Sequence, residues 1–328
     1  MKKSLGIGVL LLVVAAFTAW RSHDPETGRY VFLSAYNLEN LLQRIGLFGV
    51  LGFAAAFVIV TGGIDLSIGA VVCVAGCVLP WLLRDRGCGG GAALVLTLLL
   101  CAGIGLWHGL LVAGLGLQPF VVTLCGLLLY RGWMRGFSDD QTMGFGDAAE
   151  GLRWLATGKL PLGESFGLPV PLLALAFIAV GTWVVWSRTV WGRHLFALGR
   201  NEEAARFAGV PTRRLTIAAY VACSLLAGFG GCLFVLDVNS AQASSFGSFY
   251  ELYAIAGAVL GGVALRGGEG SVLGIVLGSA LMQVLPNTIR LLFDSDRMEF
   301  AVVGGVILVG AIADQVVGRW ASRRRRPA

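Results

Sequence analysis

The sequence is poor in charge and in the patterns that build catalytic or metal sites. Only 13% of its 328 residues are charged and only 3 are histidine, while 56% are hydrophobic. It contains no His-Glu-x-x-His motif, and no Gly-x-Ser-x-Gly or paired-carboxylate arrangement that makes a convincing catalytic constellation. A phosphate-binding loop of the form Gly-x-x-x-x-Gly-Lys-Ser/Thr is also missing, so ATP hydrolysis through that motif is excluded. We therefore expect a protein that is not an enzyme, with no catalytic residues, cofactor or metal.

The cysteines and histidines do not form a ligand pattern. The sequence has 7 cysteines without Cys-x-x-Cys spacing, and most of them interrupt apolar segments, where they are expected to act as small core residues. The histidines are widely separated, at His23, His108 and His194.

Apolar runs of membrane-spanning length recur along the whole chain and predict an all-α, polytopic transmembrane helical bundle. Glycine pairs such as Gly103 and Gly105, Gly257 and Gly261, and Gly274 and Gly278 have spacings that permit close contact between membrane helices. We expect a single transmembrane domain over residues 1–328 with about ten spans, at about 5–20, 44–61, 66–83, 91–115, 118–136, 170–187, 214–236, 250–265, 271–293 and 299–317.

Basic residues indicate the orientation. Lys2 and Lys3 precede the first span, arginines crowd residues 188–214, and Arg323 to Arg326 follow the last span. Cytoplasmic loops are enriched in Lys and Arg, so both termini are expected in the cytoplasm and the number of spans is even. The positive charge is explained by headgroup contact and topology, without nucleic acid. The first apolar segment lacks a small-x-small cleavage site before Trp20 and is expected to remain as an anchor.

Two polar segments interrupt the spans. Residues 137–169 are expected to form an external loop, with a short amphipathic helix around Ala148 to Ala156. This loop either docks a delivery protein or simply covers the helix ends.

The second polar segment, about residues 188–213, contains a predicted two-turn helix. Asn201 is a good N-cap, Glu202 and Glu203 place negative charge in the first turn, and Gly209 supplies the stop. Because a helix this short is unstable in water, it must rest on its own membrane domain or on a partner. It is either an ordinary capped loop helix or a docking element.

The motif Thr61-Gly-Gly-Ile-Asp65-Leu-Ser67-Ile-Gly69 places an acid and a Gly-Gly pair inside a long apolar region. A carboxylate at mid-membrane costs about 2.5–3.5 kcal/mol on insertion scales, so Asp65 is expected to have a role. It either accepts hydrogen bonds from the hydroxyls of a solute in a broken helix, or caps the next span by accepting from amides near Ile68. Both roles are compatible.

Other polar and aromatic residues in apolar surroundings are candidates for a substrate path. They suit a neutral hydroxylated solute, because a charged solute calls for unpaired opposite charges and few are available. The candidates are Asp65, Thr61, Ser67, Gln118, Phe120, Thr123, Tyr250, Glu251, Gln283 and Asn287.

Four blocks of the sequence resemble the ribose-type branch of ABC (ATP-binding-cassette) sugar permeases, a branched family of bacterial inner-membrane import subunits. They are the motif from Thr61 to Gly69, Gln118-Pro119-Phe120-Val-Val-Thr123-Leu124, the segment from Leu198 to Ala205, and Tyr250-Glu251-Leu-Tyr-Ala-Ile-Ala256 with the glycine pairs that follow it. They occur in the family's order. Arg200 departs from the pattern, because a small residue is usual between Gly199 and Asn201.

This resemblance implies a transport subunit of the bacterial inner membrane whose motor is a separate protein. The implied partners are ABC ATPase subunits at the cytoplasmic loop, a periplasmic or extracellular sugar-binding protein, a second permease subunit in a homodimer or heterodimer, and the lipid bilayer. The residues implied in ATPase coupling are Gly199, Asn201, Glu202, Glu203, Ala204, Ala205 and Gly209. The alternative is an ion-coupled secondary transporter, although few acids lie at membrane depth for coupling an ion.

Overall fold

The computed structural model is a bundle of helices. It describes residues 2–25, 28–163 and 165–293, together with 298, 300–302, 304–305 and 308. The helices are α1 (Lys2–Arg21), α2 (Ala35–Val60), α3 (Ile68–Pro80), α4 (Gly90–Leu115), α5 (Pro119–Ser138), α6 (Glu150–Thr157), α7 (Val170–Arg188), α8 (Val190–Arg200), α9 (Glu202–Phe207), α10 (Thr212–Val238), α11 (Tyr250–Leu260) and α12 (Val272–Phe293). A 3-10 turn forms over Val31–Leu33 and a π-helical turn over Trp81–Asp85.

Three short antiparallel strand pairs join the connecting segments, so the bundle is predominantly helical with small strand elements that the sequence did not predict. They pair β1 (His23–Asp24) with β2 (Arg29–Tyr30), β3 (Thr142–Gly144) with β6 (Ser240–Gln242), and β4 (Lys159–Pro161) with β5 (Gly167–Pro169). The β3–β6 pair links the segment after α5 to the segment after α10.

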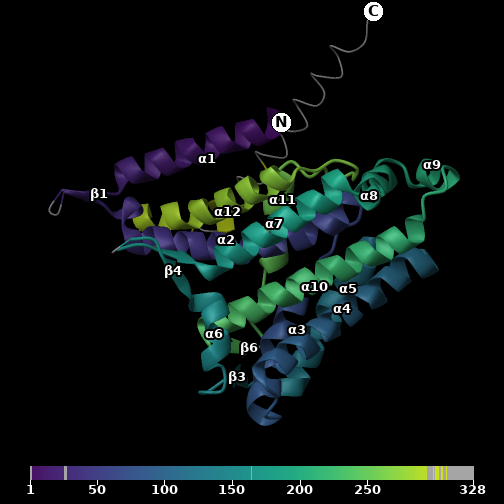
Figure 1. Cartoon of the computed structure of the whole chain (residues 1–328), viewed down its shortest axis with the longest axis horizontal. Helices are drawn as coiled ribbons and strands as arrows, with labels where there is room; N and C mark the ends of the chain where they lie inside the picture. Colours follow the sequence, from purple (N-terminus) through teal and green to yellow (C-terminus); the bar gives the residue numbers. More distant parts are fainter. Residues whose placement is uncertain are drawn as a thin grey trace, which may run out of the picture.

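The long helices lie in two groups that pack on each other. Helices α1, α12, α2 and α7 run side by side, and α10, α4 and α5 form the second group, with α3 packed against it (Figure 1). All residues from Ile45 to Val60 and all of α3 are buried, so the core lies around α2 and α3. The short helix α9 lies at one end of the bundle, and α6, β3 and β4 lie toward the other (Figure 1).

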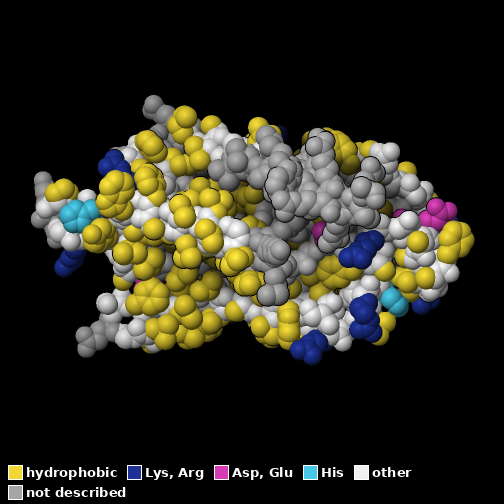
Figure 2. Space-filling model, turned by 90° about the horizontal axis from the view of Figure 1, so that it is seen from above, with side chains coloured by type: hydrophobic (Ala, Val, Ile, Leu, Met, Phe, Trp, Pro, Cys, Tyr) yellow, Lys and Arg dark blue, Asp and Glu magenta, His cyan; other side chains and the backbone are white. Residues whose placement is uncertain are grey.

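The outer surface is suited to lipid. Figure 2 shows hydrophobic side chains over most of the described surface of one face, with Lys and Arg side chains gathered mainly toward the end that carries α9. By length and composition, six helical segments of the described chain can cross a membrane, which are Ala35–Val60, Ile68–Asp85, Gly90–Leu115, Val170–Arg188, Thr212–Val238 and Val272–Phe293.

The predicted count of about ten spans is not confirmed. Helices form at nine of the ten predicted positions, but most of 299–317 lies outside the described residues, as do Arg323 to Arg326. Helix α11 ends at Leu260, because the chain turns at Gly262, which has a positive φ of 88°. Its 11 residues rise about 16 Å, roughly half of a bilayer's hydrocarbon thickness. The prediction of a full span over 250–265 is therefore wrong.

Helix α2 begins earlier than predicted. It starts at Ala35 rather than near residue 44, and Ser34 caps it by accepting a hydrogen bond from the Asn37 amide at 3.3 Å. The polar residues of its first turns find partners far along the chain: Glu39 pairs with Lys159 at 2.6 Å. A search for apolar runs cannot detect such a helix start.

Close helix contact through glycine is confirmed for α11 and α12. A Cβ on Gly278 would overlap the carbonyl oxygen of Gly257 and lie 2.6 Å from the amide nitrogen of Gly261. A Cβ on Gly105 would also overlap backbone atoms of α10. By contrast, a Cβ on Gly103 would have no described atom within 4 Å, so the prediction of close contact is wrong there.

Replacing Gly278 with valine is expected to lower the unfolding temperature of the purified protein, because overpacking a tight contact costs about 1–3 kcal/mol. The measurement is thermal unfolding in detergent micelles. Gly103→Val is the matched control, since it adds the same side chain to a membrane helix at an open position. Equal unfolding temperatures for both variants would show that the α11–α12 contact is not tight.

Candidate functional site

The predicted docking helix forms at the expected place. Asn201 ends α8, with its amide donating to the Ala197 carbonyl at 3.2 Å, and begins α9, with its side-chain oxygen accepting from the Ala204 amide at 2.9 Å. The N-cap prediction for Asn201 is therefore confirmed. Gly209 follows the helix with a positive φ of 80°, which is the predicted stop.

Most of α9 is exposed. Ala205 packs against the bundle, whereas Glu202, Glu203 and Ala204 face outward. Phe207 is 79% exposed at the end of the helix. The acidic and aromatic surface of α9 thus faces away from its own bundle, at the end of the molecule where α9 lies (Figure 1).

Gly199 precedes Asn201 by two residues in α8 and, unlike most of α9, is buried inside the bundle. A Cβ at this position would overlap both the Val60 carbonyl oxygen and the Gly268 amide nitrogen. Among the predicted coupling residues, Gly199 and Ala205 are buried and the others are exposed. The predicted set therefore contains a buried contact as well as an exposed surface.

The helical conformation is interrupted within the motif from Thr61 to Gly69, which fits both interpretations of that motif. Helix α2 ends at Val60, its C-cap Thr61 donates its hydroxyl to the Val58 carbonyl at 2.7 Å, and α3 begins only at Ile68. Residues 61–67 form a non-helical loop between two buried helices, and we call it the Asp65 loop. Non-helical backbone at membrane depth is tolerated where it is buried in protein or lines a cavity.

Asp65 is buried at 2% exposure and satisfied within the protein. One carboxylate oxygen accepts from the Ser67 amide at 2.8 Å and from the Ser67 hydroxyl at 2.6 Å, and the other accepts from the Cys223 thiol at 3.5 Å. As predicted, Asp65 accepts from a backbone amide next to Ile68, that of Ser67, but the N-cap residue of α3 is Ser67 and not Asp65. In this conformation a solute cannot reach the carboxylate unless the Asp65 loop moves.

Thr123 joins α5 to the Asp65 loop. Its buried hydroxyl lies 3.2 Å from the Ile64 carbonyl and 3.0 Å from the Pro119 carbonyl, to either of which it can donate. Gln118 and Phe120, predicted from the same block, are exposed, with Phe120 at 51%. The structure therefore brings Asp65, Ser67 and Thr123 together but leaves Gln118 and Phe120 at the surface.

A group of polar side chains that was not predicted from the sequence lies beside this loop. The Tyr130 hydroxyl and the His108 Nε2 atom are 2.8 Å apart, and the His108 ring packs edge-on against Tyr220 at 6.3 Å. A Cβ on Gly63 would lie 2.9 Å from the Tyr220 hydroxyl. Within the described part of the chain, the Tyr220 hydroxyl and the His108 Nδ1 atom have no hydrogen-bond partner. Their positions in separate apolar runs gave no signal that they would meet.

The other predicted path residues lie in separate environments. Tyr250 belongs to an aromatic cluster, with ring centroids 5.0 Å from Phe48 and 4.7 Å from Phe234. Glu251 is buried against Gly69 of α3. These residues follow an irregular segment after β6. Arg131 of α5, which was also not predicted, donates to the Ala243 and Phe246 carbonyls of this segment, both at 3.1 Å.

The two candidates on α12 differ. Gln283 is buried, whereas Asn287 exchanges hydrogen bonds with Asn37 of α2 at 2.7 and 3.4 Å. The Asn287 amide is therefore engaged in holding two helices together. The ten candidates do not form one continuous lining in this conformation.

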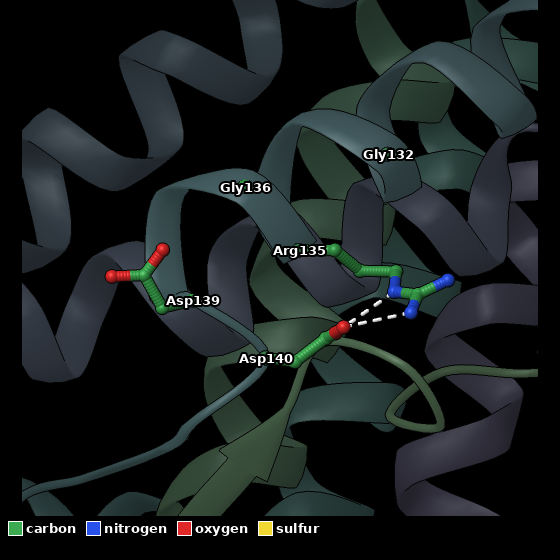
Figure 3. Close-up of a pocket in the computed structure, with 5 residues that line it drawn as sticks. All are labelled: Gly132, Arg135, Gly136, Asp139 and Asp140. Carbon is green, nitrogen blue, oxygen red and sulfur yellow. Dashed lines mark hydrogen bonds and ion pairs between the residues drawn. The ribbon is translucent and has the colours of Figure 1, made fainter.

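The open hollow at the end of α5 contains none of the predicted path residues. Its volume is about 440 Å³, and it is lined by Gly132, Arg135, Gly136, Asp139 and Asp140 (Figure 3). Arg135 grips Asp140 with two hydrogen bonds of 2.7 and 2.8 Å, and the hydrogen bond from Arg135 holds the pKa of Asp140 below its ordinary value. Asp139 points away from this pair (Figure 3). No metal-binding group of three or more His, Cys, Asp or Glu side chains occurs in the described part.

Comparison with known proteins extends over nearly the whole chain. A family model described as "Branched-chain amino acid transport system / permease component" matches residues 37–311. The chain is 33% identical over 308 residues to the ribose import permease protein RbsC of Escherichia coli (strain K12), covering 93% of this chain and 92% of that protein. It is 30% identical over 311 residues to RbsC of Bacillus subtilis (strain 168), with 95% and 91% covered.

A relative that is named for a different sugar, xylose, is similar over a comparable share of the chain. The xylose transport system permease protein XylH of Escherichia coli (strain K12) is 28% identical over 371 aligned positions, covering 97% of this chain and 94% of that protein. No solved structure gives a significant match.

Proposed function

Because the chain belongs to the family of membrane permeases described as the branched-chain amino acid transport system permease component, we propose that it is the membrane subunit of an ATP-driven importer for a monosaccharide or sugar-like solute. It passes solute from a binding protein into the bacterial cytoplasm. The chain performs no covalent chemistry, and its motor is a separate ATPase.

The observation that carries this proposal is the outward-facing α9. A helix of 6 residues is far below the length that is stable alone, yet its exposed side carries two carboxylates and a phenylalanine instead of packing on the bundle. An exposed aromatic side chain flanked by charge is the composition of an interface anchor. We assign α9 as the surface that a cytoplasmic ATPase subunit grips, with Glu202, Glu203, Ala204 and Phe207 as contacts.

A sugar fits the interior better than an amino acid, although the family description mentions branched-chain amino acids. The relatives above that match over nine-tenths of their length are named for ribose and xylose. An amino acid carries an ammonium and a carboxylate together, and each calls for an opposite charge along its path. The Asp65 loop offers the Asp65 carboxylate and the Ser67 hydroxyl, and the neighbouring α5 adds the Thr123 hydroxyl, all of which suit solute hydroxyls once the loop moves.

We assign the remaining partners to the two sides of the membrane in accordance with the position of α9. With α9 in the cytoplasm, both chain termini are cytoplasmic and the loop over residues 137–169 faces outward, where a binding protein delivers the solute. This loop has a fixed base, because Glu39 accepts from Lys159 and from the Gly167 amide, both at 2.6 Å. A second permease subunit, identical or homologous, completes the pathway in the inner membrane.

The test is uptake by purified permease reconstituted in liposomes with an ABC ATPase and a sugar-binding protein chosen from those that the neighbouring reading frames encode. With radiolabelled ribose and xylose as probes, we expect uptake of at least one sugar to require ATP and to survive a protonophore. Uptake that proceeds without the ATPase and stops when the protonophore is added would instead establish the ion-coupled alternative.

A further inference from the structure

Three chain segments meet by their backbones at the end of α2. The Gly268 amide donates to the Val60 carbonyl at 2.9 Å, and Gly199 fits against both of these groups so closely that a Cβ would overlap them. Val60 is the last residue of α2, Gly199 belongs to the end of α8, and Gly268 lies in the loop between α11 and α12. The contact therefore joins three elements that are more than 60 residues apart in the sequence.

Two more glycines complete this contact. A Cβ on Gly267 would lie 2.7 Å from the Gly199 carbonyl oxygen and 2.8 Å from the Gly62 amide nitrogen. Gly62, Gly267 and Gly268 have φ values of 87°, 82° and 72°, which residues with side chains rarely adopt. We call Val60, Gly62, Gly199, Gly267 and Gly268 the glycine junction.

Arg200 adds a side-chain connection to the junction. Its Nε atom donates to the Gly268 carbonyl at 3.4 Å, and a Cβ on Gly268 would overlap the Arg200 Cγ atom. Arg200 is the residue at which this chain departs from the small residue usual for the ribose-type branch. In this chain the aliphatic part of the Arg200 side chain therefore covers the glycine junction, where a small residue would leave open space.

The junction connects α9 to the Asp65 loop and includes Gly62 of that loop. Arg200 is followed by Asn201, the cap of α9, and Val60 is followed by Thr61, the first residue of the Asp65 loop. Close-packed backbones cannot compress. A displacement of α8 and α9 is therefore passed to the end of α2 and to the loop between α11 and α12, both of which Gly199 contacts. Asp65 becomes available to a solute only if its loop moves.

From this geometry we infer that the glycine junction is a positioning element that transmits movement of α9 to the Asp65 loop, so that ATP-driven closure of the motor controls exposure of Asp65. The inference rests on the proposed function, because it needs an ATPase at α9. Gly199, Gly268 and Arg200 are positioning residues, since none of them needs to touch the solute.

The test compares amide hydrogen exchange in the reconstituted permease–ATPase complex with and without ATP and vanadate. In the wild type, we expect nucleotide to change exchange in residues 201–209, where the ATPase docks, and also in residues 61–67. In Gly199→Ala, the response of 201–209 is expected to remain and that of 61–67 to be lost. Gly103→Ala, which adds the same methyl group to a helix at an open position, is expected to respond like the wild type.

The outcomes separate this inference from the proposed function. If nucleotide changes neither segment in the wild type, the ATPase does not act through α9 and the proposed function fails. If 201–209 responds but 61–67 does not, or if Gly199→Ala keeps the full response of 61–67, the junction does not transmit movement.

A second variant covers the case in which Gly199→Ala fails to fold. Arg200→Ala removes the hydrogen bond to Gly268 and the packing of the stem without creating an overlap. We expect a weaker nucleotide response in residues 61–67 with that of 201–209 unchanged. Arg193→Ala, on the exposed surface of the same helix, is the matched control. An unchanged response in Arg200→Ala would overturn the assignment of Arg200.

Discussion

Reversing the charge of Glu203 in the Glu203→Arg variant is expected to abolish ATP-driven uptake and solute-stimulated ATP hydrolysis, while membrane insertion remains intact. Glu203 lies in the first turn of α9 and is exposed, so its carboxylate contributes to no packing inside the bundle. The variant therefore leaves the membrane domain unchanged and alters only the surface of α9.

The size of the effect follows from two electrostatic contributions. Replacing an acid in the first turn removes a favourable interaction of about 0.3–1 kcal/mol with the helix dipole. In the variant, an ATPase surface that is complementary to the carboxylates of Glu202 and Glu203 faces a positive charge instead. Like charges placed together across an interface cost several kcal/mol. Since each 1.4 kcal/mol is about tenfold in affinity, we expect the ATPase to bind at least about a hundredfold more weakly.

Asp85→Arg is the matched control for this variant. It reverses a charge at the end of the π-helical turn that follows α3, where Asp85 pairs with Arg84 at 2.9 Å on the exposed surface. Loss of an exposed pair costs about 0–1 kcal/mol, so uptake is expected to be near normal. The measurements are co-purification of the ATPase and uptake in liposomes. Wild-type uptake by Glu203→Arg would exclude α9 from coupling and return it to an ordinary capped loop helix.

The Asp65→Asn variant is expected to assemble normally and to lose transport. Asparagine keeps the oxygen that accepts from the Ser67 amide and hydroxyl, so the turn before α3 persists. It replaces the second oxygen, which faces the Cys223 thiol, by an amide group and removes the negative charge. A hydrogen bond to a charged group is worth about 1.5–3 kcal/mol, so losing one to the solute lowers uptake roughly tenfold to a hundredfold.

The control for Asp65→Asn is another buried polar residue without a proposed role in transport. Thr97 is fully buried in α4 and donates its hydroxyl to the Ala93 carbonyl of the same helix at 2.8 Å. Thr97→Val is expected to keep near-normal uptake and ATPase co-purification. Wild-type uptake by Asp65→Asn, measured at equal protein level, would show that Asp65 is solely a cap.

Local patterns in the sequence were sufficient for the features that depend on neighbouring residues. The cap at Asn201, the stop at Gly209 and the break between α2 and α3 all follow from the conformational preferences of a few consecutive residues. The apolar runs also located most of the long helices, because a membrane span is defined by its own composition.

Features that depend on distant partners were not predictable in the same way. The early start of α2 depends on partners such as Lys159 for Glu39 and Asn287 for Asn37. The meeting of His108 with Tyr130 and Tyr220 depends on how α4, α5 and α10 rotate against each other. No pattern within one helix specifies that rotation, so the polar group beside the Asp65 loop appeared only in three dimensions.

The shared cap at Asn201 determines how stiff the connection between α8 and α9 is. Its main chain closes one helix and its side chain opens the next, so no unconstrained residue separates them. Because no freely rotating residue separates the two helices, a displacement of α9 is passed to α8 in full. Each inserted residue would add two rotatable backbone dihedrals that absorb part of this displacement. The one-residue length of the connection between α8 and α9 is therefore as important for transmitting movement as the side chains that α9 exposes.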